Sequence, residues 1–519
     1  MTAKPHRILV VGGGTAGWLT AGYLARLLGA DLPGAIEITL VESLDIGTLG
    51  VGEGTFPTIR KTLSRIGLDE AELVRRCGAT FKQGAKFVHW RDVPGAAGTD
   101  HYFHAFQTAD SRVGVELMPY WLIGVAGDIP WDEACTPQKR AADAQRGPKL
   151  PSHPDFIGPL NYAYHFDVAR LVPLLREQAI ANGVKHLIGT VDEVRLDSEG
   201  AIAGVSCADR VLTADLYIDC TGFRAALIGK ALGRPWKSCR DVLFCDSAIA
   251  LQVPYDAPDA PIASYTISTA QESGWIWDIG VDDRRGLGHV YSSAHMEADS
   301  AELILRSYAG PAGKGLEARR FKFDPGFREV NWYKNCVAVG LSSGFFEPLE
   351  ATGIVFAEMG ANLIANLYPW AGDFETSARQ FNANMLKRYV RTLDFIKLHY
   401  CISKRRDSPF WVENVDPIST PDSLHELLDR WRYRPPNELD IDPNIDIFDA
   451  TSWQYVLYGM GWKTDLSARI GAFRLLPEAK AAFAEVQRQA EFATRNLPSN
   501  RDLVRFAQDS AFGPTAGAA

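Results

Sequence analysis

The sequence predicts an α/β fold in which a parallel-sheet core is followed by a mostly helical module. Three observations support this prediction: a strand, glycine turn, helix and strand open the chain, β-rich segments recur later, and residues beyond about 370 have helical apolar spacing. We therefore expect a core over residues 1–370 with a loop-rich insertion at 94–160. A helical module over 371–511 and a disordered tail at 512–519 complete the expected organisation.

The first forty residues form the opening unit. An apolar run at 7–11 precedes the glycine turn, residues 18–28 have helical spacing, and a β-rich segment at 36–41 ends at Glu42. This order of elements, with an acid at the end of the second strand, is the fingerprint of a Rossmann-like dinucleotide-binding fold.

Each glycine of this turn has a separate physical role. Gly12 permits the tight turn, Gly14 allows a pyrophosphate to approach backbone amides, and Gly17 allows close packing of helix on strand. Glu42 would accept hydrogen bonds from the adenosine ribose.

Later β-rich segments are expected to complete the sheet. Strands are predicted at 186–196, 202–207 and 211–218, and another at 336–339 leads into a loop with glycine and serine. Late strands of this kind are typical of large flavoproteins, and no second GxGxxG motif is visible. The pattern therefore favours FAD over NAD and makes a separate nicotinamide-binding domain improbable.

Two helical patterns follow. A helix is predicted to begin at Thr352, and a longer amphipathic helix is predicted after 370. The apolar positions of the longer helix are Phe374, Ala378, Phe381, Met385, Tyr389, Leu393, Ile396 and Tyr400.

Composition excludes several classes of protein. The 519 residues are 46% hydrophobic and 23% charged, which argues against disorder, collagen and coiled coil as descriptions of the whole chain. A net charge of −9 offers no general attraction to nucleic acid or anionic lipid. The eight cysteines show no CxxC pair or zinc-type cluster, and no apolar stretch is long enough to span a membrane. We expect a cytoplasmic protein with reduced thiols, no metal, and neither nucleic acid nor a membrane as partner.

Several motifs, in their order and spacing, resemble the flavin-dependent halogenase family of the tryptophan-halogenase type. They are GGGTAGW (12–18), GVGEGTFP (50–57), GATFKQGAKFVHW (78–90), IDCTGFR (218–224), WIWDIG (275–280), GLSSGFFEPLEATGI (340–354), DFIKLHY (394–400) and Phe410-Trp411. The resemblance implies an FAD-binding core of the flavin monooxygenase type. It also implies that reduced FAD from a separate flavin reductase, O2 and chloride or bromide give hypohalous acid, which halogenates an indole-like aromatic such as indole, tryptophan or a derivative. A homodimer is left open.

The resemblance assigns the central roles to two residues. Lys82 would hold hypohalous acid by a hydrogen bond or as a haloamine, although residue chemistry alone does not separate it from Lys86. Glu350 would polarise the halogenating species or take the ring proton. The alternative is that Glu350 is an ordinary acid stabilised by a helix N-terminus.

Further residues are assigned to halide, substrate and flavin. Thr352 and Gly353 open a helix whose free N–H groups suit a halide ion. His104 and Phe106 would sandwich the indole. The expected cofactor-binding residues are Gly12, Gly14, Thr15, Ala16, Gly17, Glu42, Ser43, Gly52, Glu53, Val191, Leu341 and Ile354.

A tryptophan pair and two departures from the family pattern complete the picture. Trp275 and Trp277 would keep substrate away from the flavin, with ordinary core packing as the alternative. Gly280 stands where relatives have proline, and Ala351 stands where they usually have serine. These departures keep two other hypotheses open: a flavin-dependent monooxygenase of an aromatic substrate, and a non-catalytic flavin-binding protein.

Overall fold

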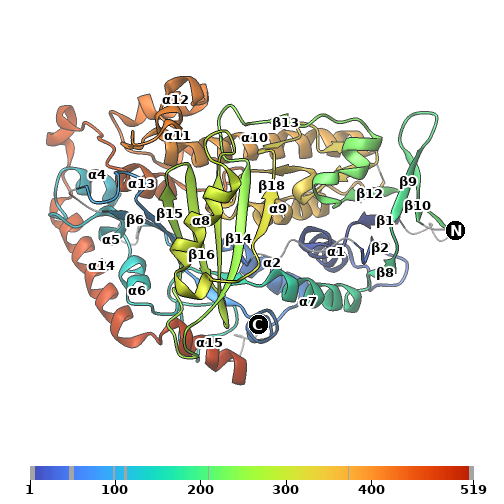
Figure 1. The fold of residues 1–519 in the computed structure, drawn as a ribbon, viewed down its shortest axis with the longest axis horizontal. Helices are drawn as coiled ribbons and strands as arrows, with labels where there is room; N and C mark the ends of the chain where they lie inside the picture. The colour runs from blue at the N-terminus through green and yellow to red at the C-terminus, as the bar shows by residue number, and fades with distance from the viewer. Residues whose placement is uncertain are drawn as a thin grey trace. The chain divides into compact units, whose positions relative to one another are not determined.

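The computed structural model describes residues 6–45, 52–96, 100–109, 114–207, 210–371 and 373–513 (Figure 1). The chain divides into two compact units, each assembled from three separate stretches. Unit 1 contains Met1–Gly78, Phe166–Cys239 and Asp324–Tyr389, and unit 2 contains Ala79–His165, Arg240–Phe323 and Val390–Ala519. This grouping differs from the predicted division near residue 370, because strands from distant parts of the chain join the same sheets.

Unit 1 is built on a six-stranded sheet in the order β20-β21-β12-β1-β2-β8. All neighbouring strands are parallel except the pair β20–β21. The late strand predicted at 336–339 is present and lies beside β12, so the predicted α/β core is confirmed. The strands are β20 (Trp332–Tyr333), β21 (Cys336–Ala338), β12 (Leu216–Asp219), β1 (His6–Val11), β2 (Ile36–Glu42) and β8 (Lys185–Ile188).

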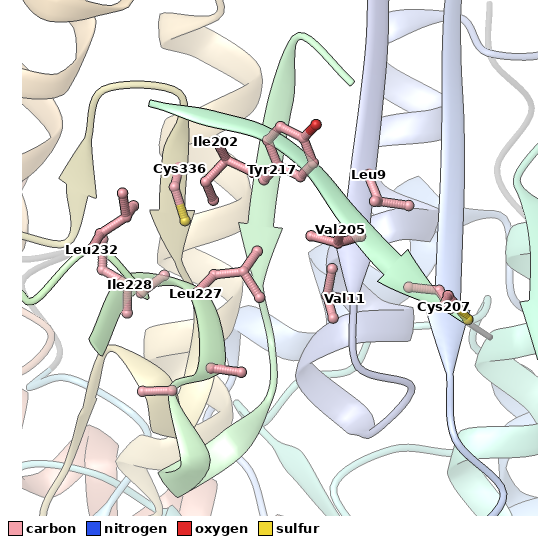
Figure 2. Close-up of a cluster of buried hydrophobic side chains, with 14 residues drawn as sticks. Leu9, Val11, Ile202, Val205, Cys207, Tyr217, Leu227, Ile228, Leu232 and Cys336 are labelled. Carbon is pink, nitrogen blue, oxygen red and sulfur yellow. The ribbon is translucent and has the colours of Figure 1, made fainter. Parts of the chain in front are cut away.

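Both faces of this sheet are buried, as parallel sheets require. Leu9 and Val11 of β1 point into a cluster with residues of β10 (Ile202–Cys207), β12, β21 and the helical turn η2 (Ala226–Ala231) (Figure 2). Ile8 and Val10 alternate to the other face and are equally buried. Helix α1 (Thr15–Leu28) packs against β2, α7 (Val168–Ala181) and α9 (Thr352–Leu367).

The prediction of three consecutive strands over 186–218 was wrong in two places. The first segment divides into β8 and β9 (Val191–Leu196), and the last divides into β11 (Arg210–Leu212) and β12. Only β9, β10 (Ile202–Cys207) and β11 form an antiparallel meander. Gly189 lies at the first division, where a Cβ would come within 2.3 Å of the Cys207 sulfur. A residue without a side chain therefore lets the chain pass from one sheet to the other.

Unit 2 contains a seven-stranded sheet in the order β18-β14-β17-β16-β15-β5-β6, which sequence analysis did not predict. Its neighbours are antiparallel except β15 and β5. Helix α8 (Ala298–Ala309) covers part of the sheet in Figure 1, with Ala301 and Leu305 in one apolar cluster with Ile249 and Leu251. The strands are β18 (Arg319–Lys322), β14 (Ser247–Pro254), β17 (Arg284–Tyr291), β16 (Gly274–Gly280), β15 (Thr266–Gln271), β5 (Gly84–Val88) and β6 (His101–Ala105).

Unit 2 also contains a short antiparallel pairing of β4 (Thr80–Lys82) with β7 (Ala163–Phe166). The long helix predicted after residue 370 is present as α10 (Phe374–Cys401), whose residues up to Tyr389 belong to unit 1 and whose remainder belongs to unit 2. The other helices of unit 2 are α4 (Leu117–Leu122), α5 (Trp131–Ala134), α6 (Gln138–Asp143), α11 (Pro409–Asn414), α12 (Asp422–Trp431), α13 (Ala450–Gly459), α14 (Leu476–Asn496) and α15 (Asn500–Asp509). Unit 1 also contains α2 (Thr58–Ile66), α3 (Glu70–Cys77), β3 (Glu53–Gly54), β13 (Lys237–Ser238), β19 (Gly326–Phe327) and β22 (Gly344–Phe345).

The C-terminal segment is ordered further than predicted. Phe512 is buried against Phe81, and Gly513 forms a β-bridge with Pro154, so the predicted disordered tail at 512–519 begins in packed chain. Residues 514–519 lie outside the described residues. Among the helices that the structure describes, none is both long and apolar enough to cross a membrane.

Candidate active site

The glycine turn of unit 1 has the tight backbone predicted at Gly12 and the close packing predicted at Gly17. Gly12 has φ of 112°, and a Cβ there would lie 2.3 Å from the carbonyl oxygen of Cys220. A Cβ on Gly17 would lie 1.9 Å from the Gly12 oxygen, so helix and turn touch at this point. A Cβ on Gly14, in contrast, would meet no described atom within 4 Å. Gly12 and Gly17 are fixed by close backbone contacts, whereas Gly14 borders open space.

The open space beside Gly14 lies at the start of α1. The chemistry of this helix start shows whether the turn fits a dinucleotide. The described first turn of α1 carries no acidic residue, and its N-cap residue makes no side-chain capping bond. The first N–H groups of a helix have no partner within the helix, and the helix dipole favours an anion there. The residues present therefore fit the pyrophosphate of FAD.

Glu42 ends β2, as predicted. Its carboxylate accepts hydrogen bonds from Trp18 Nε1 at 3.3 Å and from His186 Nε2 at 2.9 Å. These bonds fix the carboxylate beside the turn, and a carboxylate retains further acceptor positions. Binding of a ribose hydroxyl by Glu42 stays a prediction.

Other predicted cofactor residues of unit 1 come together near this turn. The Ser43 hydroxyl lies 2.7 Å from the hydroxyl of Thr190, directly before Val191. The turn at Gly340 and Leu341 meets the start of α1, because a Cβ on Gly340 would lie 2.6 Å from the Cβ of Ala16.

The motif at 50–57 is only partly described, because residues 50 and 51 lie outside the described ranges. Gly52 has φ of 78°, a left-handed conformation that favours glycine. Burial raises the pKa of the Glu53 carboxyl to about 7, so near neutral pH this group can donate as well as accept a hydrogen bond.

Helix α9 begins with an open N-terminus in unit 1. Its described first turn has no acidic residue, its N-cap makes no side-chain bond, and a Cβ on Gly353 would meet no described atom within 4 Å. The N-cap is Ala351, held at φ 56° and ψ 36°. A non-glycine residue in this conformation costs roughly 1–2 kcal/mol, and it turns the chain sharply between the buried Glu350 and Thr352.

A buried acid lies further along α9. The Glu358 carboxylate accepts hydrogen bonds from the hydroxyls of Thr58, at 3.1 Å, and Thr62, at 2.6 Å, both on α2. Burial raises the pKa of Glu358 to about 8. Sequence analysis missed this residue, since a single acid in an apolar helix gives no distinctive pattern.

Lys82 and Phe106 come together in unit 2. Lys82 ends β4 and is only 3% exposed, and its Nζ lies 5.1 Å from the centre of the Phe106 ring. Lys86 is more exposed, with 21% of its side chain accessible, and its Nζ forms a salt bridge with Asp143 at 3.2 Å. The structure thus separates two lysines that residue type alone did not.

Aromatic rings surround the predicted substrate residue His104. Its ring centre lies 5.6 Å from Phe395, 6.1 Å from Phe448 and 5.9 Å from Tyr455. Phe395 and Phe448 stack on each other at 3.8 Å, and Trp453 meets Phe395 edge-on at 4.9 Å. Sequence analysis did not assign a role to Phe395 or Phe448, and for Phe395 the DFIKLHY motif was the only signal.

The tryptophan pair lies on β16, with the two ring centres 6.4 Å apart. Both rings are buried, and Trp277 lies against Gly288 of β17, where a Cβ would come within 2.0 Å of the indole. Gly280 ends the same strand, and a Cβ there would lie 2.6 Å from the hydroxyl of Tyr255. A larger residue at 280 would therefore require the Tyr255 side chain to move. The Gly280 carbonyl also accepts a 2.6 Å hydrogen bond from Thr80, two residues before Lys82.

Comparisons with known proteins identify the family of this chain. The profile of the tryptophan halogenase family matches residues 7–473. Tryptophan 6-halogenase SttH of Streptomyces toxytricini is 35% identical over 96% of this chain and 97% of its own length. The crystal structure of a tryptophan halogenase from Shewanella frigidimarina has a TM-score of 0.94 and 37% identity over 99% of both chains. The structure of Tar14, a tryptophan C-6 flavin-dependent halogenase, has a TM-score of 0.90 and 34% identity over 97% of this chain and 100% of that one.

The fold and the family match define a flavin-dependent enzyme with a dinucleotide-binding α/β core. The chain belongs to the tryptophan halogenase family. The predicted family, fold class and halogenase activity are therefore confirmed, and FAD is the cofactor that the family implies.

Proposed function

We propose that this halogenase uses chloride or bromide to halogenate an indole-like aromatic, with tryptophan, indole or an indole derivative as substrate. The observation that carries the proposal is the buried Lys82, whose ammonium lies over the Phe106 ring. Inside the protein, the ammonium can bind a polar oxidant, and the neighbouring aromatic face can stack on an aromatic substrate. Relatives named tryptophan 6-halogenase and tryptophan 7-halogenase support a substrate of this class.

Residues of unit 1 bind FAD. The N–H groups behind Gly14 bind the pyrophosphate, and Glu42 orients the ribose. Bound reduced FAD supplies the two electrons that convert O2 and halide into hypohalous acid. A separate flavin reductase delivers it. Binding of halide falls to the open N-terminus of α9, through the amides of Thr352 and Gly353.

Lys82 and Glu350 carry the transfer to the ring. Lys82 holds the hypohalous acid and orients its halogen, and Phe106 and His104 supply stacking faces that fix which ring carbon is presented. Hydroxide leaves the halogen and forms water with a proton from Lys82. When the carbon–halogen bond forms, the ring loses one proton, which Glu350 takes. Trp275 and Trp277 keep the aromatic substrate from the flavin.

The proposal also covers the cellular location and the oligomeric state of the protein. A cytoplasmic location is supported by the eight cysteines, which all lie in described ranges and are all free. A homodimer stays open.

Product mass tests the function directly. The purified protein is supplied with a flavin reductase, NADH, FAD, bromide and either indole or tryptophan. A product with a bromine isotope doublet supports the proposal, whereas a single added oxygen would indicate a monooxygenase and peroxide alone a non-catalytic flavin protein. Lys82→Ala should abolish bromination and leave oxidation of reduced flavin intact. Lys86→Ala is the matched control and should retain bromination, since Lys86 is paired with Asp143.

A further inference from the structure

A histidine lies beside Lys82 on the neighbouring strand. In the antiparallel pair β4–β7, Thr80 is opposite His165 and Lys82 is opposite Ala163. Side chains alternate along a strand, so Thr80, Lys82 and His165 share one face of the pair. Lys82 and His165 are diagonal neighbours on that face, a separation that long side chains can bridge.

The His165 ring is fully buried and uses only one of its nitrogens. Its Nε2 lies 2.8 Å from the hydroxyl of Thr266 on β15, and its exposed fraction is 0%. Its Nδ1 has no hydrogen-bond partner among the residues that the structure describes. When Nε2 donates its proton to the Thr266 hydroxyl, Nδ1 is left as a buried acceptor. A buried acceptor without a partner is uncommon and needs a physical reason.

Electrostatics connect this acceptor to Lys82. Burial, and then the positive charge of Lys82, hold the pKa of His165 well below its ordinary value. Helix α15 also packs on β4, but its Arg501 donates to the carbonyls of Ala260 and Asp282. Because two adjacent buried cations are unfavourable, Lys82 and His165 together carry a single positive charge. Moving one proton from the ammonium to the imidazole leaves that total unchanged and removes the Lys82 charge that opposes protonation of His165.

We propose that His165, oriented by Thr266, is a positioning residue that takes a proton from the Lys82 ammonium through one bridging water, so that Lys82 meets hypohalous acid as a free amine. The proposal rests on the proposed function of Lys82. The amine nitrogen then bonds to the halogen as the halogen–oxygen bond breaks, and the departing hydroxide takes one amine proton to form water. The resulting haloamine passes its halogen to the ring, the lysine nitrogen takes back the proton that His165 holds, and the ring proton goes to Glu350.

The test compares two buried histidines of unit 2. His165→Gln should lower bromination on the order of 10- to 100-fold near pH 7 and recover as the pH rises to about 9, where hydroxide replaces the lost base. Oxidation of reduced flavin should not change. His289→Gln is the matched control, because His289 is also fully buried and one of its ring nitrogens has no partner among the described residues. Burial lowers its pKa to about 4 against the raising effect of a hydrogen bond to the Ala301 carbonyl, and Lys82 makes no contribution. It should keep the wild-type pH profile.

A second variant covers a failure of His165→Gln to fold. Thr266→Val removes the orienting hydroxyl and should move the pH profile in the same direction by a smaller amount. A wild-type profile in these variants, or a loss that is equal at every pH, would overturn the proposal. If Lys82→Ala still brominated the substrate, the proposed function itself would fail, whereas an inactive Lys82→Ala with an unchanged His165→Gln profile would reject only the histidine.

Discussion

The buried acid of α9 gives a quantitative test of the structure. Replacing Glu358 by Gln keeps an oxygen that can accept from one threonine of α2 and an amide that can donate to the other. The replacement therefore preserves the contacts and removes only the titration. In the wild type, burial raises the pKa of Glu358 from 4.5 to about 8. The folded protein consequently binds this proton more tightly than the unfolded chain does.

The sign and size of the effect follow from that difference. The stabilisation from the bound proton is complete below the ordinary pKa of 4.5 and is lost as the pH rises through about 8. Each tenfold change in proton affinity corresponds to roughly 1.4 kcal/mol, so the full loss at high pH is about 5 kcal/mol. About 3 kcal/mol of this loss falls between about pH 5.5 and 8.

Urea unfolding of both proteins across this pH range measures the effect. Glu358→Gln should gain about 3 kcal/mol in free energy of unfolding relative to wild type between about pH 5.5 and 8. The effects of other titrating groups cancel in the difference between the two free energies of unfolding. Hydrogen exchange of residues 352–367 identifies the transition in which α9 unfolds. Parallel stability curves for the two proteins would refute a buried, protonated Glu358.

Three further predictions follow from the site. Glu350→Gln should lower the halogenation rate on the order of 10² to 10⁴-fold with an unchanged melting temperature. A rate loss below twofold would mean that Glu350 only stabilises a helix N-terminus, a contribution of about 0.3–1 kcal/mol. Gly14→Asp should leave stability equal or raise it by about 0.3–1 kcal/mol, since its Cβ has room at a helix start, yet the carboxylate should expel FAD, as equilibrium dialysis would show. Gly280→Ala should lower the free energy of unfolding by about 1–3 kcal/mol through its clash with Tyr255, and Tyr255→Phe should restore part of that loss; no rescue would place the strain elsewhere.

Local patterns in the sequence predicted the elements that depend on local chemistry. The turn at Gly12, the acid at the end of β2 and the long helix α10 follow from glycine spacing and apolar periodicity, and all three are found. The division of residues 186–218 between two sheets was not predictable in the same way. A β-rich segment carries no information about which distant strand it pairs with, and the contact of Gly189 with Cys207 exists only after folding.

The candidate site shows the same limit. The family resemblance selected Lys82 over Lys86, and the structure adds that Lys82 is the more deeply buried of the two. His165 and Thr266 gave no signal, because a histidine and a threonine about one hundred residues apart become a pair only through strand register. The rings of Phe395 and Phe448 likewise meet only when α10 and the segment before α13 are in place.

The interleaved chain of the two units has a consequence for synthesis on the ribosome. Strand β1 emerges first and can pair with β2 at once, but its other neighbour, β12, begins at residue 216 and β21 follows at residue 336. The parallel sheet of unit 1 therefore stays open along one side until β21, at Cys336–Ala338, has been made. Exposed apolar strands that wait for distant partners are prone to aggregation. We expect the nascent chain to need a chaperone during this interval, and fragments ending before residue 336 to be insoluble even though they contain the complete glycine turn.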